Sequence, residues 1–244
     1  MSTPYIAHIS EEETQNTYTT EKTRVGQLAM VEDGRLFRFT ENGGVATVCS
    51  EMQQARLEVV ANALAQAVGT MAAGVTVLTG VGASNASFAV NILKGGYVFS
   101  PTSADLNPVY RIKSNTLITL GAETGTITLW TPTVAAIGVN STISYIRSLW
   151  RDTIVAVSTT PTAMVLGVAV NATPVDNFGW IQSRGVASVL FSDTPVIGDP
   201  LGPGTAPGAA REFAAGSAEV NPVYGICVVA AANTVTGLAF LTID

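Results

Sequence analysis

Residues 162–244 contain a series of short apolar runs that indicate the fold. The runs are AMVLGVAV (163–170), FGWIQSRGVASVLF (178–191), TPVIGDPLGP (194–203), VYGICVVAA (223–231) and TGLAFLTID (236–244). Each is rich in Val, Ile, Leu or aromatic residues and is closed by Gly, Pro, Asp or Asn. Such runs are typical of short strands joined by tight turns. The stretch therefore predicts a compact β-barrel or β-sandwich.

The upstream sequence predicts further strands. Residues 24–47 fit a hairpin, because Asp33-Gly34 stands between two apolar runs and Asp-Gly is a strong hairpin signal. Residues 70–150 fit a second β unit, with an alternating strand at 109–113. The expected fold class is therefore all-β. Residues 24–50 and 161–244 form a barrel or sandwich, and residues 51–160 provide a connecting segment and an inserted β domain.

Residues 51–68 are the one segment with a helical pattern. The sequence EMQQARLEVVANALAQAV contains good helix formers, and Leu57, Val60, Leu64 and Val68 recur near the helical period. A helix and an extended path both remain open for this segment.

The expected core is built from inward-facing positions of the predicted strands. These positions are Val31, Phe37, Phe39, Tyr110, Ile112, Ile118, Leu129, Val168, Val170, Trp180, Val189, Ile226, Val228, Leu241 and Ile243.

Two segments are candidate interaction surfaces. Residues 1–23 are polar and irregular, and their large apolar groups are nearly all Tyr5, Ile6, Ile9 and Tyr18. We expect an extended arm that orders by adding a strand to a neighbouring subunit, with a dispensable tail as the alternative. In the C-terminal run, Leu238 and Phe240 lie on the strand face opposite Leu241 and Ile243. Because both faces are apolar, the second face needs a cover, which predicts a homo-oligomer.

The composition restricts the classes of partner. Charged residues make up 12% of the 244 residues, against roughly 25% in an average soluble protein, which favours a surface covered by other subunits. A monomer with a Thr- and Ser-rich surface is the alternative. The net charge is −6 and Lys and Arg are scattered singly, so we expect no nucleic-acid partner.

No apolar run reaches the ~18 residues that span a bilayer, and the start of the chain lacks the features of a signal peptide. We therefore expect no membrane partner and assembly in a cytoplasm.

Cysteine usage agrees with a cytoplasmic origin. Cys49 and Cys227 lack the spacing of a metal site. In a cytoplasmic protein two buried free thiols are expected, with a disulfide as the alternative.

Groups able to support catalysis are few. The one histidine, His8, lies in the polar terminus, where no formed pocket is expected. The candidate carboxylates for a glycosidase pair are Asp152, Asp176, Asp193, Asp199, Glu212 and Glu219. Most lie in turn contexts, where Asp bonds its own backbone. We expect no enzyme, no cofactor and no metal.

The chain has three tryptophans, Trp130, Trp150 and Trp180. They fit anchors of the core or of an interface, and the alternative is a sugar-stacking platform.

Several phrases resemble structural proteins of tailed-bacteriophage heads, in particular the small β-barrel proteins that decorate or cement the capsid. The phrases are GVAV (167–170), FGWIQSRGVASVL (178–190), VIGDPLGP (196–203), GICVVAAA (225–232) and LAFLTID (238–244), with VGQLAMVEDGRLFRFTENGG (25–44) and GGYVF…VYRIKSN (95–115) upstream. The resemblance starts at about residue 24 and rests on turn-and-strand patterns without catalytic groups.

This resemblance implies a virion protein that binds the major capsid protein on the outer capsid surface and stabilises the shell. It also implies a homotrimer, because trimers suit the threefold joints of such a shell. A receptor- or carbohydrate-binding fibre or tail module is the alternative function, and a β-fold hydrolase is a third.

Overall fold

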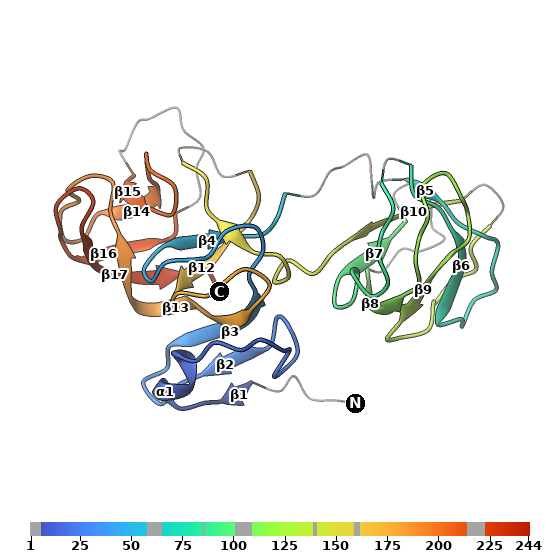
Figure 1. Cartoon of the computed structure of the whole chain (residues 1–244), viewed down its shortest axis with the longest axis horizontal. Coiled ribbons are helices and arrows are strands. Elements are labelled where there is room, and N and C mark those ends of the chain that lie inside the picture. The colour runs from blue at the N-terminus through green and yellow to red at the C-terminus, as the bar shows by residue number, and fades with distance from the viewer. Residues whose placement is uncertain are drawn as a thin grey trace. The chain divides into compact units, whose positions relative to one another are not determined.

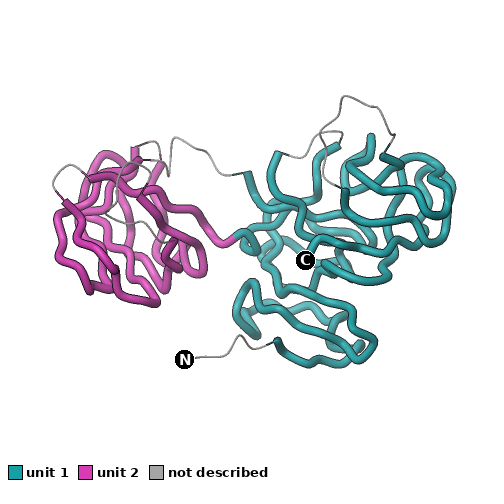
Figure 2. The backbone as a smooth tube through the Cα atoms, turned by 180° about the vertical axis from the view of Figure 1, so that it is seen from behind, with its two compact units in different colours: residues 1–57, 149–244 teal, residues 58–148 magenta. Residues whose placement is uncertain are grey.

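The computed structural model describes residues 6–57, 65–84, 86–100, 109–138, 141–158, 162–213 and 223–244. Its strands form two sheets, which confirms the all-β fold class. The chain divides into two compact units, residues 1–57 with 149–244 and residues 58–148, coloured separately in Figure 2. The second unit is therefore an insertion between two parts of the first.

The first unit contains one short helix and, among the described residues, an eleven-stranded sheet (Figure 1). Its elements are β1 (Ala7–His8), α1 (Glu11–Thr14), β2 (Leu28–Met30), β3 (Leu36–Glu41), β4 (Met52–Gln54), β11 (Ile154–Val155), β12 (Val165–Ala169), β13 (Phe178–Leu190), β14 (Pro200–Pro203), β15 (Ala210–Glu212), β16 (Gly225–Val229) and β17 (Thr236–Thr242). The main strand order is β1-β2-β3-β13-β17-β16-β14-β15. A branch runs from β13 through β12 and β4 to β11.

The β2–β3 hairpin forms at the predicted Asp-Gly turn. Gly34 has φ +85°, a conformation that glycine adopts without steric cost. The amide of Gly34 donates to the carbonyl of Val31 at 3.0 Å. Phe37 and Phe39 share the buried face of β3, as predicted from their alternation.

The thirteen-residue strand β13 organises the first unit. Its first half pairs with β3 on one side and β12 on the other, and residues 178–183 are buried on both faces. Its second half pairs with β17 and alternates between buried and exposed residues. The register against β3 shifts between Gln182 and Arg184, and Gly185 follows with φ +88°. A Cβ on Gly185 would lie 2.8 Å from Cγ of Arg35, so the close approach at this bulge requires glycine.

Most of the expected core is buried, but β16 faces the other way from the prediction. Ile226 and Val228 are 47% and 37% exposed, whereas Cys227 is buried. The reason is register: Gly225 lies opposite Leu241, where a Cβ would meet the Phe240 carbonyl oxygen at 2.2 Å. Because side chains alternate along a strand, Cys227 then points into the core and its neighbours point to solvent.

No helix forms in the described parts of residues 51–68. Residues 52–54 form β4, residues 66–67 form β5, and residues 58–64 lie outside the described residues. Gln54 is fully buried; its Nε2 donates to Thr162 Oγ1 at 2.9 Å and its Oε1 accepts from the Val157 amide at 3.2 Å. Pairing of β4 with β11 and β12 thus outweighs the helix propensity of the segment. It also places residues 51–57 and 149–158 in the first unit, within the range assigned from the sequence to the insertion.

The described part of the N-terminal segment lies against its own unit. β1 pairs in parallel with β2, and Ser10 caps the four-residue helix α1. The amide of Tyr18 donates to the Phe178 carbonyl at 2.8 Å, and the Phe178 amide donates back at 2.8 Å. The expected strand pairing thus occurs within the chain for residues 6–18, because β2 would otherwise be an open sheet edge.

The second unit is a barrel. Its strands are β5 (Gln66–Ala67), β6 (Val77–Val81), β7 (Tyr97–Phe99), β8 (Tyr110–Asn115), β9 (Gly125–Leu129) and β10 (Thr142–Ile146), in the order β5-β10-β7-β8-β9-β6. The two end strands meet, since Gly69 donates to the Thr79 carbonyl at 2.9 Å and Gly82 donates to the Ala67 carbonyl at 3.0 Å. The enclosed core includes Leu78, Ile112, Ile127 and Tyr145.

Candidate functional site

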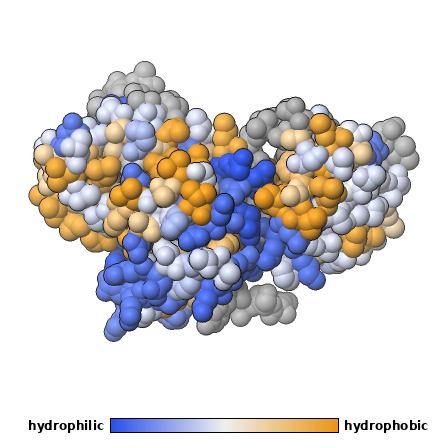
Figure 3. Space-filling model, viewed as in Figure 1, coloured by the Kyte–Doolittle hydropathy of each residue, from blue (hydrophilic) through white to orange (hydrophobic). Residues whose placement is uncertain are grey.

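The outer face of β13, β17 and β16 is apolar and exposed. Val186 lies opposite Phe240, and Phe240 lies opposite Ile226, so these three side chains form one row across three strands. A second row contains Leu238 with Val229. All five side chains are 37–47% exposed, and Figure 3 shows apolar residues gathered over β16 and β17.

Alternation explains how this face arises. In β17 the buried residues are Gly237, Ala239 and Leu241, so Leu238 and Phe240 must point outward. Antiparallel sheets commonly keep the outward face polar. Here that face is apolar over three adjacent strands, which is typical of a surface covered by a partner.

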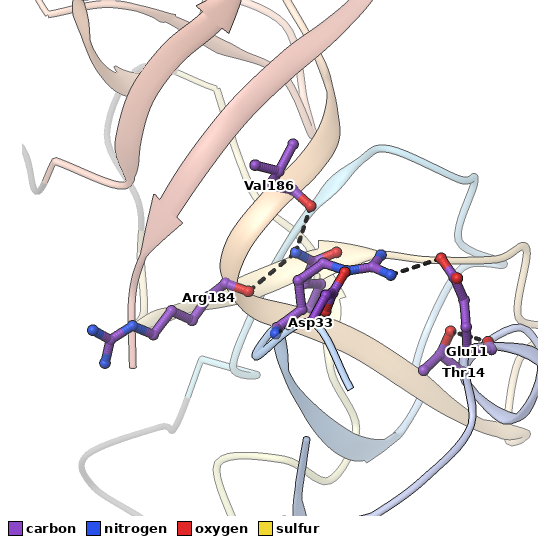
Figure 4. Close-up of polar contacts among 7 residues, drawn as sticks. Glu11, Thr14, Asp33, Arg184 and Val186 are labelled. Carbon is purple, nitrogen blue, oxygen red and sulfur yellow. Dashed lines mark hydrogen bonds and ion pairs between the residues drawn. The ribbon is translucent and has the colours of Figure 1, made fainter. Parts of the chain in front are cut away.

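A groove with a volume of about 680 Å³ adjoins this face. Its lining includes apolar Val186, Leu238 and Phe240 and charged Glu11, Asp33, Arg35 and Arg184. Figure 4 shows the charged part: Arg35 Nη2 lies 2.6 Å from Glu11 Oε1. Arg35 Nε lies 2.6 Å from Asp33 Oδ2. In the same view the Arg184 side chain points away from this cluster.

Ion pairs and hydrogen bonds hold several polar side chains of the groove in place. Desolvation alone would raise the pKa of Asp33, but hydrogen bonds from Arg35 outweigh it and lower that pKa. Gln182 Nε2 donates to the carbonyls of Arg184 at 3.1 Å and Val186 at 2.8 Å, satisfying backbone groups at the bulge (Figure 4). Glu11, Asp33 and Arg35 are therefore paired within the chain, whereas Val186, Leu238 and Phe240 are exposed apolar side chains of the groove.

The six predicted interface residues have different environments. Tyr5 lies outside the described residues, and Ile6 is 41% exposed. Ile9 and Tyr18 pack against the core cluster that contains Phe39, so these two side chains are occupied within their own unit. Leu238 and Phe240 lie together on the exposed face. Sequence reasoning missed Val186, Ile226 and Val229, although the alternation of residues 186–190 contained the signal for Val186.

The candidate chemical groups have different environments, and Glu219 lies outside the described residues. His8 is exposed on β1. Cys49 and Cys227 are free thiols, as expected, but Cys49 is exposed and only Cys227 is buried. Burial raises the pKa of the Cys227 thiol, and the charges of Asp199 and Asp193 add to the shift. Asp199 accepts from the amide of Val196 at 2.7 Å, in the turn role predicted for it.

The tryptophans divide between core and surface. Trp180 is buried and meets Phe39 edge-on at 5.1 Å between ring centroids. Trp150 stacks with the Arg38 guanidinium at 5.0 Å. Trp130, in the second unit, is 54% exposed. A single platform of all three is therefore wrong, because Trp180 is enclosed in the first unit.

The described residues contain no candidate metal-binding group and no candidate membrane-spanning helix. No group of three or more His, Cys, Asp or Glu side chains there is arranged to hold a metal ion. No described helix is both long and apolar enough to cross a membrane. Comparison with protein-family models, curated proteins and solved structures finds no match.

Proposed function

We propose that the chain is a structural subunit that functions by assembly, and specifically a decoration or cement protein of a tailed-bacteriophage capsid. The observation that carries the assembly proposal is the exposed apolar face of β13, β17 and β16. This face lies on a rigid sheet and therefore loses little conformational entropy when it is covered. The resemblance of the strand and turn phrases to head decoration proteins supports the more specific assignment.

In this proposal the protein forms a homotrimer and binds the major capsid protein on the outer surface of the shell. A ligand that binds only the assembled shell stabilises it by mass action. The net charge of −6 supports the outer location, because the packaged DNA would repel an acidic protein inside.

Thermal stability of emptied shells tests this function. Shells that lack the protein are heated with and without added protein, and we expect a higher disruption temperature with it. The variant Phe240→Asp should give little or no protection. Val45→Asp is the matched control, since Val45 is 69% exposed in the same unit but lies outside the three strands. Equal disruption temperatures with and without wild-type protein would contradict the proposal.

A receptor- or carbohydrate-binding module of a virion fibre or tail is the second candidate function. The exposed Trp130 favours it, since Trp is large and rarely this accessible unless it contacts a partner.

A further inference from the structure

The outside of the barrel unit carries a row of aromatic and cationic side chains. Tyr97 of β7 pairs with Arg111 of β8, and the amide of Trp130, directly after β9, donates to the Arg111 carbonyl at 3.1 Å. Their chain neighbours Val98, Tyr110, Ile112 and Leu129 are buried in the barrel. By alternation, Tyr97, Arg111 and Trp130 therefore project outward in one row.

This row is accessible. Tyr97 is 38% exposed and Trp130 is 54% exposed. The ammonium of Lys113 lies 5.6 Å from the centroid of the Trp130 ring and forms no ion pair with any described residue. Two rings and a cation available to solvent at one place can contact a ligand with both apolar and anionic parts.

The local charge differs from that of the rest of the chain. Residues 58–148 contain four Lys or Arg and three Asp or Glu, whereas the remaining residues contain eight and fifteen. A cationic row on an acidic protein favours an anionic ligand of low charge density. A nucleic-acid strand carries a phosphate on every nucleotide and needs a longer basic track than these residues supply.

We propose that this row binds an acidic oligosaccharide, a chain of sugar rings that carry carboxylates. Trp130 and Tyr97 stack against the apolar faces of two sugar rings, and the ammonium of Lys113 pairs with a carboxylate of the same chain. The two aromatic residues are two strands apart, which is about 10 Å, so neighbouring or alternate sugar rings of one chain reach both. The site lies in the inserted unit; it is independent of the proposed capsid function and rests on the second candidate function, a carbohydrate-binding module.

Titration of the full-length protein with tetragalacturonate tests the site, with the fully methyl-esterified tetrasaccharide as the neutral probe. Calorimetry gives the affinity, and the indole N–H signal of Trp130 in nuclear magnetic resonance reports contact. We expect Trp130→Ala to weaken binding of the acidic probe about tenfold or more. Lys113→Gln should weaken it by about tenfold but leave binding of the ester unchanged.

Two variants serve as matched controls. Lys22→Gln removes an equal charge from a lysine that also lies over an aromatic ring, at 5.9 Å from Tyr18 in the first unit. Leu117→Ala truncates a 52% exposed residue of the second unit, six residues along the chain from Arg111. Both should bind the acidic probe as the wild type does.

The proposal is overturned if the wild type does not bind tetragalacturonate, or if Trp130→Ala binds it as the wild type does. Tighter binding of single-stranded oligothymidine than of tetragalacturonate would also overturn it and would assign the row to nucleic acid. A change in subunit association caused by Trp130→Ala would overturn it and would assign the row to a subunit contact. Circular dichroism of each variant confirms that the strands remain folded.

Discussion

Val186 of β13 and Phe240 of β17 lie directly opposite each other on neighbouring strands, and both side chains point to solvent. Cross-strand neighbours of this kind have Cβ atoms about 5 Å apart, so the two side chains form one continuous apolar surface. Ile226 extends that surface onto β16. In the proposed assembly, this row would be the contact area for an identical subunit or for a capsid protein.

The first prediction concerns self-association through this row. Phe240→Asp should weaken trimer formation by a factor of about 100 or more, because association would bury an unpaired carboxylate. Sedimentation velocity at micromolar concentration measures the change. Val45→Asp adds the same charge elsewhere on the unit and should sediment as the wild type does. A wild-type protein that remains a stable monomer would count against the trimer.

The second prediction concerns the aromatic core of the first unit. Trp180 is 5% exposed and packs against Phe39, which also stacks with Phe178 at 5.9 Å between centroids. Trp180→Ala should lower the free energy of unfolding by ~3–5 kcal/mol, because it leaves a large cavity. Urea denaturation measures this. Trp130→Ala, which truncates an exposed tryptophan, should cost less than about 1 kcal/mol, and equal costs for the two variants would contradict the assigned burial.

Local sequence patterns predicted much of the sheet because their signals are themselves local. Asp33-Gly34 marks a turn irrespective of the rest of the fold, and Phe37 and Phe39 alternate with the polar residues Arg38 and Thr40, which identifies the buried face. In residues 225–229 both faces are apolar, so the two-residue period does not choose between them. Pairing of Gly225 with Leu241 makes that choice, and it is a contact distant in sequence.

The helical pattern of residues 51–68 and the role of the N-terminus also depended on distant contacts. Gln54 is satisfied by Thr162 and Val157, more than one hundred residues away. The few apolar residues of segment 1–23 did not indicate that Tyr18 would contact Phe39 and Phe178 of its own unit. At the candidate interface, Leu238 and Phe240 were predicted from the apolar residues on both faces of 238–243, only one of which faces the core.

The third prediction concerns pH. Burial alone would raise the pKa of Asp244, but hydrogen bonds from Arg38 and Ser183 outweigh burial and lower that pKa. Arg38 Nε and Nη2 donate to the two carboxylate oxygens at 2.8 and 3.0 Å, and Ser183 Oγ donates at 2.9 Å. Since the folded pKa lies below the unfolded value of about 3.9, this stabilisation is present above that pH. It is lost as the pH falls through the folded pKa.

The measurement is the pH dependence of the difference between wild type and Asp244→Asn. We expect the variant to be less stable by roughly 1–2 kcal/mol at neutral pH, and the difference should shrink below about pH 4. Urea denaturation from pH 3 to pH 7 gives both curves. Glu32→Gln, which changes an exposed carboxylate on the β2–β3 turn, is the control. A difference that is constant over this range would show that the carboxylate charge does not stabilise the fold.

The fourth prediction concerns the N-terminal segment. Tyr18 packs against Phe39 at 6.0 Å between ring centroids, and its hydroxyl donates to Glu13. Glu11 pairs with Arg35, so two members of the acidic run 11–13 have partners within the chain. The segment therefore covers the edge of its own aromatic core. Deletion of residues 2–22 should lower the free energy of unfolding by about 2–4 kcal/mol, because Phe39 and Phe178 lose this cover.

Two variants separate this structural role from the proposed contact with a neighbouring subunit. Tyr18→Ala keeps the segment but removes its main contact with the core, and should account for about half of the stability loss. Ile6→Ala changes a residue that is 41% exposed and should leave stability unchanged. Loading onto emptied shells is then measured for the deletion variant at a temperature where it is folded. If it loads with wild-type affinity, the segment stabilises its own unit only, and the predicted addition of a strand to a partner is wrong.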